Sequence, residues 1–430
     1  MTTTVQALAI KSRTHPRYRF QNLSSLLDGR RLRESWGQLN KSASAGIDKI
    51  DARKYAEKLV ENIATLENRL KEGRYRAGII KRVYIPKANG KKRALGLPTV
   101  EDKIVQQSVS QILQSIWEQD FLPNSYGYRP SKSAHGAVQS LCVNLQFRGY
   151  GYIVEADIKG FFDNMSHQWL MLMLKQRIDD KRLLMLIQQW LKARVQEPDG
   201  KINKSSQGTP QGGVISPVLA NIYLHYVIDI WFERVVKPRL KGRAMLIRYA
   251  DDFVVAFQYK HEAEKFYRVL PKRLNKFGLD ISPEKTELKR FSRFLPGKQR
   301  QFQFLGFSYY WSKDRKGEAR LRRRTAKMKQ REAFKSISFW IKLNRHLKLS
   351  ELMCSLKRKL TGFSNYFGIT DNSRSITNYY NHVIRTLFKW LNRRSQRKSF
   401  NWDQYKQMLN WYMIQPLKVR KLPGLKLDWY

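Results

Sequence analysis

Two adjacent acidic residues, Asp251 and Asp252, stand between two short apolar runs in the second half of the chain. Residues 245–247 precede them and residues 253–257 follow them, and β-branched and aromatic side chains are common in both runs. Runs of this length and composition predict two buried strands, with the two acids in the tight turn between them. Carboxylates are seldom buried unless they are paired or bind a metal, and Mg²⁺ prefers oxygen ligands. The pattern predicts a β-hairpin that holds divalent cations, with an ordinary polar turn as the alternative.

The charge of the chain predicts its class of partner. The 430 residues carry a formal net charge of +47, which indicates a polyanionic partner such as nucleic acid and salt-sensitive binding. The hydrophobic content of 42% is enough for a sizeable core in one to three domains. Cys142 and Cys354 are the two cysteines, which excludes a disulfide framework or a Cys-rich zinc site and indicates an intracellular protein. No secretory signal is expected from the first ten residues, and no apolar run reaches the ~18 residues that span a bilayer.

A second acidic segment, residues 155–163, follows a predicted strand that begins near residue 151. If this strand lies beside the hairpin, Asp157 faces Asp251 and Asp252. Three carboxylates at one point repel one another strongly unless cations lie between them. Two Mg²⁺ ions ~3.5–4 Å apart would remove that repulsion and catalyse phosphoryl transfer. The alternative is that Asp157 only caps the following turn.

The segment 206–213 contains two Gln-Gly pairs and a proline. It lacks the spacing of a Walker phosphate-binding loop. Its glycines would allow a flat backbone to approach a base pair or a sugar closely, and the alternative is a flexible loop before a helix.

Apolar periodicity gives a coarse secondary structure for the rest of the chain. Helices are predicted over 55–70, 102–121, 133–147, 168–191, 214–232 and 260–277, a hairpin with a basic tip over 79–97, and a strand over 302–310. After residue 311 strand patterns disappear. Residues 313–400 contain 24 Lys or Arg and 5 Asp or Glu, a net charge of +19 (24 minus 5), and they predict a separate basic helical domain.

In this order, the motifs resemble those of group II intron-encoded reverse transcriptases, which are also maturases. Residues 249–252, Tyr-Ala-Asp-Asp, resemble the catalytic tetrapeptide of that family, and the segment around Asp157 resembles its first acidic motif. Residues 207–219 resemble its QGxPQGGxxSPxL motif. Further similar segments are 45–48, 85–98, 126–135, 278–286 and 304–307, so that the resemblance covers residues from about 20 to 400.

The resemblance implies an α+β fold of the right-hand polymerase type, with fingers, a palm whose antiparallel sheet bears the catalytic acids, and a helical thumb. The implied divisions are an N-terminal extension with the start of the fingers (1–75), fingers (76–150), palm (151–312), thumb or maturase domain (313–395) and a short basic-aromatic tail (396–430).

The resemblance also implies an RNA-directed DNA polymerase that uses two Mg²⁺ ions, with Mn²⁺ as an alternative. Asp157 and Asp251 would be the main metal ligands, joined by the carbonyl of Ile158, and Asp252 would support the site. These three acids are the expected catalytic residues.

Five other residues match positions that bind the nucleotide in the family. Phe162 lies five residues after Asp157 and matches the bulky residue that excludes a ribose 2′-hydroxyl. Lys87 and Arg93 match residues that grip the triphosphate, and a solvated basic turn is their alternative. Gln211 would touch the incoming nucleotide, and Lys285 would protonate the pyrophosphate.

The implied thumb is also the maturase domain, which binds intron RNA, and Arg322, Arg323 and Arg324 are the expected RNA contacts. The implied partners are intron RNA, an RNA template with a DNA primer, deoxynucleoside triphosphates (dNTPs) and target DNA, with no membrane and no obligatory protein partner. We expect a bacterial cytoplasmic protein that is found at the nucleoid when it acts on DNA. The C-terminal nuclease domain of some members is not expected, because Cys354 is the one cysteine beyond the implied palm.

These inferences predict an enzyme of a mobile element that assists the splicing of its intron and copies it into cDNA. Two alternatives are a domesticated reverse transcriptase in repair or phage defence, and an RNA-binding splicing cofactor without polymerase use. The intact acids Asp157, Asp251 and Asp252 favour a polymerase over the cofactor, and the sequence leaves the domesticated role open.

Overall fold

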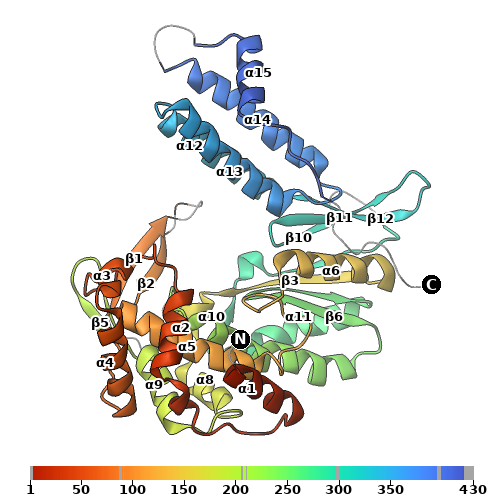
Figure 1. Ribbon diagram of the computed structural model, residues 1–430. Coiled ribbons are helices and arrows are strands. Elements are labelled where there is room, and N and C mark those ends of the chain that lie inside the picture. Colours follow the sequence, from red (N-terminus) through yellow and green to blue (C-terminus); the bar gives the residue numbers. More distant parts are fainter. Residues whose placement is uncertain are drawn as a thin grey trace.

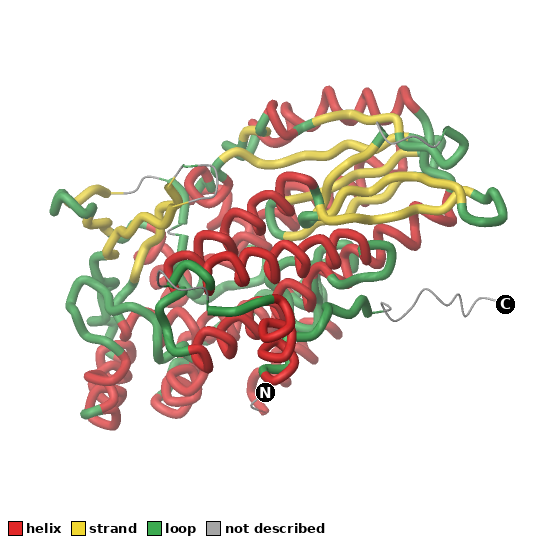
Figure 2. Tube along the Cα trace, turned by 90° about the horizontal axis from the view of Figure 1, so that it is seen from above, coloured by secondary structure: helices red, strands yellow, loops and turns green. Residues whose placement is uncertain are grey.

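The protein is described here from a computed structural model, in which residues 3–86, 90, 92–204, 207–209, 211–295, 300–394 and 399–420 are described. The fold mixes helices and strands, as expected (Figure 1). Figure 2 shows the strands gathered at two places, with helices between and around them. Helices α12–α15 form a separate layer at the top of Figure 1.

A five-stranded antiparallel sheet lies at the centre of the fold. Its strands are β3 (Tyr152–Lys159), β6 (Ala244–Tyr249), β7 (Asp252–Phe257), β8 (Asp280–Ile281) and β9 (Glu287–Arg290), in the order β6-β7-β3-β8, with β9 also paired to β3. The predicted hairpin is therefore β6–β7, and the predicted strand beside it is β3. Both predictions are confirmed.

Strand β7 shows why its sequence is apolar at almost every position. Phe253, Val255 and Phe257 belong to a core formed with helices below the sheet, whereas Val254 and Ala256 belong to a second core on the other face. Successive side chains of a strand point to opposite faces, so a strand covered on both faces reads as a continuous apolar run. The two buried faces hold the acidic turn at the end of the hairpin in a fixed place.

Helices cover both faces of this sheet (Figure 1). On one face lie α10 (Ser216–Leu224) and α11 (Lys260–Asn275), and on the other lies α6 (Ala134–Arg148). The predicted apolar helix over 214–232 corresponds to α10 and to the two π-turns that continue it, η2 (His225–Asp229) and η3 (Phe232–Val236).

The N-terminal half consists mainly of helices around the long buried α5 (Val100–Trp117), which begins where the Thr99 side chain accepts a hydrogen bond from the Asp102 backbone. Around it lie α1 (Thr3–Thr14), α2 (Gly29–Gln38), α3 (Ala52–Ala56), α4 (Leu59–Lys71), α8 (His167–Leu174) and α9 (Lys181–Leu191). The single helix predicted over 168–191 is wrong. It is two helices, because the Asp180 side chain accepts from the Leu183 backbone and starts a new helix there. The helix predicted over 55–70 is likewise divided, between α3 and α4.

The hairpin predicted over 79–97 is confirmed as β1 (Ile80–Pro86) and β2 (Lys92–Leu97). Strands β4 (Arg194–Gln196) and β5 (Ile202–Lys204) complete its sheet, in the order β2-β1-β4-β5. Lys87, at the tip of the hairpin, lies outside the described residues.

A three-stranded antiparallel sheet corrects two predictions. Strands β10 (Gln301–Phe304) and β11 (Phe307–Lys313) replace the single strand predicted over 302–310, because Leu305 and Gly306 both have positive φ and turn the chain back. Strand β12 (Ala319–Thr325) lies where a helical domain was expected, and the helices begin at Lys327. The basic charge of β12 hid its alternation, in which Leu321, Arg323 and Thr325 are the buried positions.

The C-terminal helices α12 (Lys327–Asn344), α13 (Leu349–Phe367), α14 (Ser373–Leu391) and α15 (Trp402–Trp411) share a core of their own. Trp402 stacks on Phe388 with 4.0 Å between ring centroids, and Tyr405 is fully buried. Part of the predicted tail after residue 395 therefore packs as a fourth helix. Among the helices of the described ranges, none has the length and apolar character needed to cross a bilayer.

Candidate active site

The three predicted acids meet at one end of the central sheet. Asp157 on β3 pairs in register with Asp252 on β7, and Asp251 lies in the turn that precedes β7. The turn is tight because Ala250 adopts a left-handed backbone conformation, with φ of 56°. The prediction that Asp157 faces the two acids of the hairpin is confirmed.

Burial and the neighbouring negative charges both raise the pKa of two of these acids. The pKa of Asp252 is raised to about 6, because the surrounding protein displaces water from the carboxyl group and because Asp157 and Asp251 place negative charge beside it. Burial also raises the pKa of Asp251, and Asp157 adds to that shift. Both carboxylates would be stabilised by a cation between them.

A protein cation already contacts this cluster. The Lys285 ammonium donates a hydrogen bond to Oδ2 of Asp157 at 2.7 Å, and this bond raises the pKa of Lys285. Lys285 ends the short helical turn η5 (Pro283–Lys285), which is tied to β3 where the Ser282 backbone donates to the Asp157 carbonyl. Asp157, Asp252 and Lys285 line a cleft of about 500 Å³, and Lys329 of α12 is part of the same lining.

The donor set fits Mg²⁺ bound together with a substrate. Within the described ranges, no three acidic, His or Cys side chains enclose a single point as a closed metal site would. Mg²⁺ commonly takes one or two carboxylates from the protein and its other oxygens from substrate phosphates and water. An open set of carboxylates with raised pKa values matches that second arrangement.

The Gly-rich segment contacts both the β1–β2 sheet and the short helix that follows β3. The backbone of Gly208 donates to the Met165 carbonyl at 2.8 Å, and that of Thr209 donates to the Phe162 carbonyl at 2.7 Å. Gly208 has φ of 83°, and a Cβ there would lie 2.5 Å from the Asp163 carbonyl oxygen. Gly208 thus approaches the protein backbone closely, and the close approach to a base pair or a sugar stays a prediction.

A second contact of the same segment reaches β2. The Gly96 backbone donates to the Gln211 carbonyl at 2.6 Å, and a Cβ on Gly212 would lie 2.6 Å from the Gly96 carbonyl oxygen. Through this loop, the position of the β1–β2 hairpin depends on α7 (Phe161–Asn164), the helix that carries Phe162.

The described nucleotide-binding candidates lie on elements around the acids. Arg93 on β2 is close enough to lower the pKa of Asp251 by its charge. Phe162 is half-buried and packs edge to face on the buried Phe161, with 5.3 Å between ring centroids. Gln211 is half-buried in the loop between them.

Tyr128 is a residue of this site that the sequence reasoning did not assign. It is 49% exposed, has φ of 56°, and has a raised pKa because of burial of its hydroxyl and the nearby charge of Asp251. The preceding Gly127 packs so closely on the turn that bears Asp251 that a Cβ there would lie 2.3 Å from the Ala250 nitrogen. A glycine between two tyrosines was the signal that could have drawn attention to this loop.

The three arginines expected to bind RNA do not form one surface. Arg323 is 2% exposed and pairs with Asp371 at 3.3 Å, so its assignment as an RNA contact is wrong. Arg324 donates to Gln301 and lies over the ring of Tyr310. Arg322 is half-buried. Their neighbouring positions on β12 alternate between its two faces, which a run of three like charges does not reveal.

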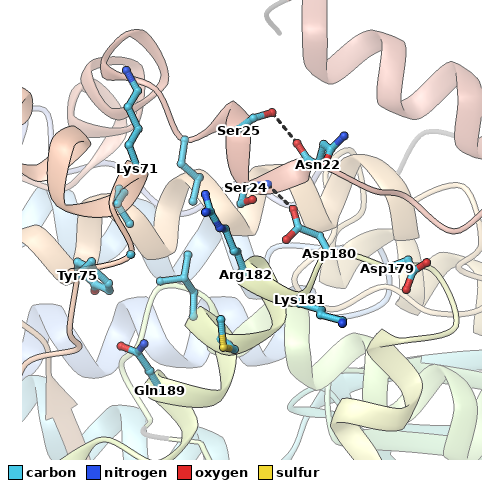
Figure 3. Close-up of a pocket in the computed structure, with 15 residues that line it drawn as sticks. Asn22, Ser24, Ser25, Lys71, Tyr75, Asp179, Asp180, Lys181, Arg182 and Gln189 are labelled. Atoms are coloured by element: carbon cyan, nitrogen blue, oxygen red, sulfur yellow. Dashed lines mark hydrogen bonds between the residues drawn. The ribbon is translucent and has the colours of Figure 1, made fainter.

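A larger cavity, of about 640 Å³, lies apart from the acids between η1 (Leu23–Leu26), the end of α4 and the start of α9 (Figure 3). Polar groups there bond mainly within the protein: the Ser24 backbone donates to Asp180, and the Ser25 hydroxyl donates to the Asn22 carbonyl. Arg182 and Lys71 extend along its wall (Figure 3). Its two acids already have partners in the protein, because Asp179 pairs with Arg19 and Asp180 accepts from the Ser24 and Leu183 backbones.

Comparison with known proteins agrees with this geometry. Residues 85–309 match the family described as reverse transcriptase (RNA-dependent DNA polymerase), and residues 330–408 match the family described as group II intron, maturase-specific domain. The chain is 29% identical to the group II intron-encoded protein LtrA of Lactococcus lactis, over 80% of this chain and 69% of that protein. It is 32% identical to protein YkfC of Escherichia coli, over 58% of this chain and 73% of that protein.

Proposed function

We propose, from the premise that this chain belongs to the family of reverse transcriptases (RNA-dependent DNA polymerases), that Asp157, Asp251 and Asp252 form the catalytic centre of its DNA synthesis. The chain is an RNA-directed DNA polymerase with a group II intron maturase domain. The register pairing of Asp157 with Asp252 beside the turn that bears Asp251 is the observation on which the assignment of these residues rests.

The elements correspond to a right hand in this proposal. The five-stranded sheet with its flanking helices is the palm, and the β1–β2 sheet with the N-terminal helices forms the fingers. Helices α12–α15 form the thumb, whose first helix contributes Lys329 to the cleft that Asp157 and Asp252 line. The thumb therefore begins near residue 327 instead of 313.

The chemistry that two bound Mg²⁺ ions would supply is activation of the primer 3′-hydroxyl and neutralisation of the leaving pyrophosphate. The ions would be held by Asp157, Asp251 and the Ile158 carbonyl. The carboxylate of Asp252 would add negative charge beside them. Mn²⁺ has the same preference for oxygen ligands and would fit the same set.

Side chains around the acids would bind the rest of the nucleotide. Arg93 and Lys87 would pair with the triphosphate, because positive side chains above the palm offset its negative charge. Phe162 would lie under the sugar and exclude a 2′-hydroxyl, and Gln211 would contact the nucleotide from the Gly-rich loop. Lys285 would donate a proton to the pyrophosphate from its place beside Asp157.

The nucleic-acid partners follow from the maturase domain and the net charge of +47. Intron RNA would bind along the exposed cations of α12 and α13, and the RNA template with its DNA primer would occupy the cleft between sheet and thumb. Target DNA would be the substrate when the intron copy is inserted.

A primer-extension assay on an RNA template tests the catalytic centre. Asp157→Asn and Asp251→Asn keep the shape of each side chain and remove its charge, so extension should fall to background while RNA affinity changes by less than about twofold. Asp199→Asn is the matched control, since Asp199 is exposed in the β4–β5 turn and should leave extension unchanged. Undiminished extension by Asp251→Asn would refute the assignment.

A further inference from the structure

One arginine inside the hairpin has every donor of its side chain occupied. The side chain of Arg248, in β6, is fully buried. Its Nε and Nη2 donate to the two oxygens of Asp229 at 2.8 and 2.6 Å. Its Nη1 donates to Asn221 Oδ1 at 3.1 Å and to the Ala250 carbonyl at 3.0 Å, and its Nη2 also donates to the Ser125 hydroxyl at 2.7 Å. These bonds account for all five N–H donors of a guanidinium.

The partners of Arg248 come from four different segments. Asp229 ends the π-turn η2, and Asn221 lies on α10. Ser125 lies in the loop that leads to Tyr128, and Ala250 lies in the catalytic turn. One rigid planar group therefore joins the helices behind the sheet to the turn that carries Asp251.

The loop that contains Ser125 also bonds to the backbone of Arg248, two residues before Ala250. The Tyr126 backbone donates to the Arg248 carbonyl, and the Arg248 backbone donates to the Asn124 carbonyl, both at 2.9 Å. Asn221 also donates to the Gly127 carbonyl at 2.7 Å, which sets Gly127 against Ala250. The loop is thus joined to β6 and its turn by the Arg248 backbone and by the side chains of Arg248 and Asn221.

Ala250 requires such support. Its φ of 56° lies in the left-handed region, which a residue with a Cβ adopts only when its surroundings impose it. The bond from Arg248 to the Ala250 carbonyl is one of those constraints, and it acts on the residue next to Asp251.

We propose that Arg248, together with Asp229, is the positioning residue of the catalytic turn. Its guanidinium sets the orientation of the Ala250–Asp251 peptide, and through it the place of the Asp251 carboxylate relative to Asp157. The inference rests on the proposed function, because it assigns Asp251 to the metal-binding centre. A buried ion pair is weak evidence for stability, since an apolar pair of similar volume often stabilises a fold as well.

Replacement of the ion pair by apolar residues tests the proposal. The double variant Arg248→Met with Asp229→Leu removes the pair without leaving an unpaired buried charge. We expect its Tm to stay within about 5 °C of the wild type. Its kcat for primer extension should fall about 10²-fold, because a displacement of about 1 Å at a reacting group has that effect. The KM for dNTP should change little, and the Mg²⁺ concentration for half-maximal activity should rise.

Two further variants keep the test decisive. Arg248→Lys retains the charge opposite Asp229 but cannot make all five bonds, so kcat should fall at least about tenfold even if the double variant does not fold. Arg177→Met with Asp120→Leu removes another ion pair, in which the buried Arg177 after α8 contacts the half-buried Asp120 after α5 and also donates to Ser12 of α1. That control should keep the kcat of the wild type.

The outcomes separate the two proposals. A wild type that does not extend a primer defeats the proposed function. An active wild type whose Arg248→Lys variant, or whose folded double variant, keeps full kcat overturns the positioning role alone. Loss of activity that tracks loss of Tm equally in the Arg248 and Arg177 double variants also overturns it, because that pattern is structural.

Discussion

The ammonium of Lys285 lies 2.7 Å from Oδ2 of Asp157, so a cation of the protein stands at a carboxylate of the proposed metal site. The Lys285 side chain is 67% exposed, whereas that of Asp157 is 20% exposed, so the lysine can leave while the acid stays. Its exposed position allows it to move from Asp157 towards a nucleotide's phosphates when these enter with their own cations.

Lys285→Met should therefore have two opposite effects. Removal of a positive charge beside Asp157 should lower the Mg²⁺ concentration needed for half-maximal extension, because the cations no longer compete. Loss of the proton donor should lower kcat by roughly 10²-fold. A Mg²⁺ titration of primer extension measures both quantities. Lys285→Arg, which keeps the charge, should keep the Mg²⁺ requirement, and an unchanged requirement in Lys285→Met would contradict this account.

Phe162 should determine the choice between deoxynucleotides and ribonucleotides. Phe162→Val opens space beneath the sugar, and the ratio of kcat/KM for ribonucleotide over deoxynucleotide should rise roughly tenfold or more. Single-nucleotide incorporation measures the ratio. Phe161→Leu is the matched control, since Phe161 is buried in the core and should affect stability without moving the ratio. If the two variants shift the ratio equally, the steric role of Phe162 is wrong.

The raised pKa of Asp252, about 6, predicts a pH-dependent stability and metal requirement. An unfolded Asp titrates near pH ~3.9, so between about pH 4 and 6 the folded chain holds a proton that the unfolded chain has lost. Without metal, the contribution of Asp252 to stability therefore falls as pH rises through this window and stays low above it. With a metal chelator present, the Tm of the wild type minus the Tm of Asp252→Asn should decline from low pH to neutral pH.

Protons and Mg²⁺ should compete at the same carboxylates. Below pH 6 the Mg²⁺ concentration for half-maximal extension should rise, because protonated Asp252 no longer attracts the cation. Asp251, whose pKa is raised in the same direction, should add to the effect. Extension assays across pH and Mg²⁺ concentration test this, and a Mg²⁺ requirement that is constant from neutral pH to pH 5 would rule it out.

Splicing assistance should be separable from DNA synthesis. Asp251→Ala with Asp252→Ala should abolish extension and still promote intron splicing. Arg331 and Lys335 lie one turn apart on the exposed face of α12, so their reversal to Glu should weaken RNA binding and impair splicing. Wild-type RNA affinity should fall by roughly 10³-fold or more between 50 and 200 mM salt if at least six phosphates are contacted. In the charge-reversal variant, RNA affinity should depend less steeply on salt concentration.

The controls for this prediction come from the same region. Arg323→Glu would remove the nearer of the two arginines that pair with Asp371 and would bury a second negative charge beside it, so it should lower Tm instead of testing an RNA contact. If the double acid variant loses splicing as completely as synthesis, or if the α12 reversal leaves the salt dependence unchanged, the two tasks do not use separate surfaces.

Local pattern was enough to predict the β6–β7 hairpin, strand β3 beside it and the meeting of the three acids. Each of these strands is buried on both faces, and a short continuous run of apolar residues is typical of such a strand. The order of motifs was enough to predict the family. Pattern failed at β12 and at the break between α8 and α9, where a charged strand and a single capping Asp decided the structure.

The sequence by itself therefore determined which acids meet at the end of the central sheet and which strands present them, because strand periodicity and turn composition are local properties. Only the tertiary structure decided what holds those acids in place. The partners of Arg248 lie up to 123 residues away, at Ser125, and Arg323 became a buried ion-paired residue through Asp371, 48 residues on. Burial and pairing of a charge depend on which distant segments pack against it, and the residues adjacent in the chain do not indicate which segments these are.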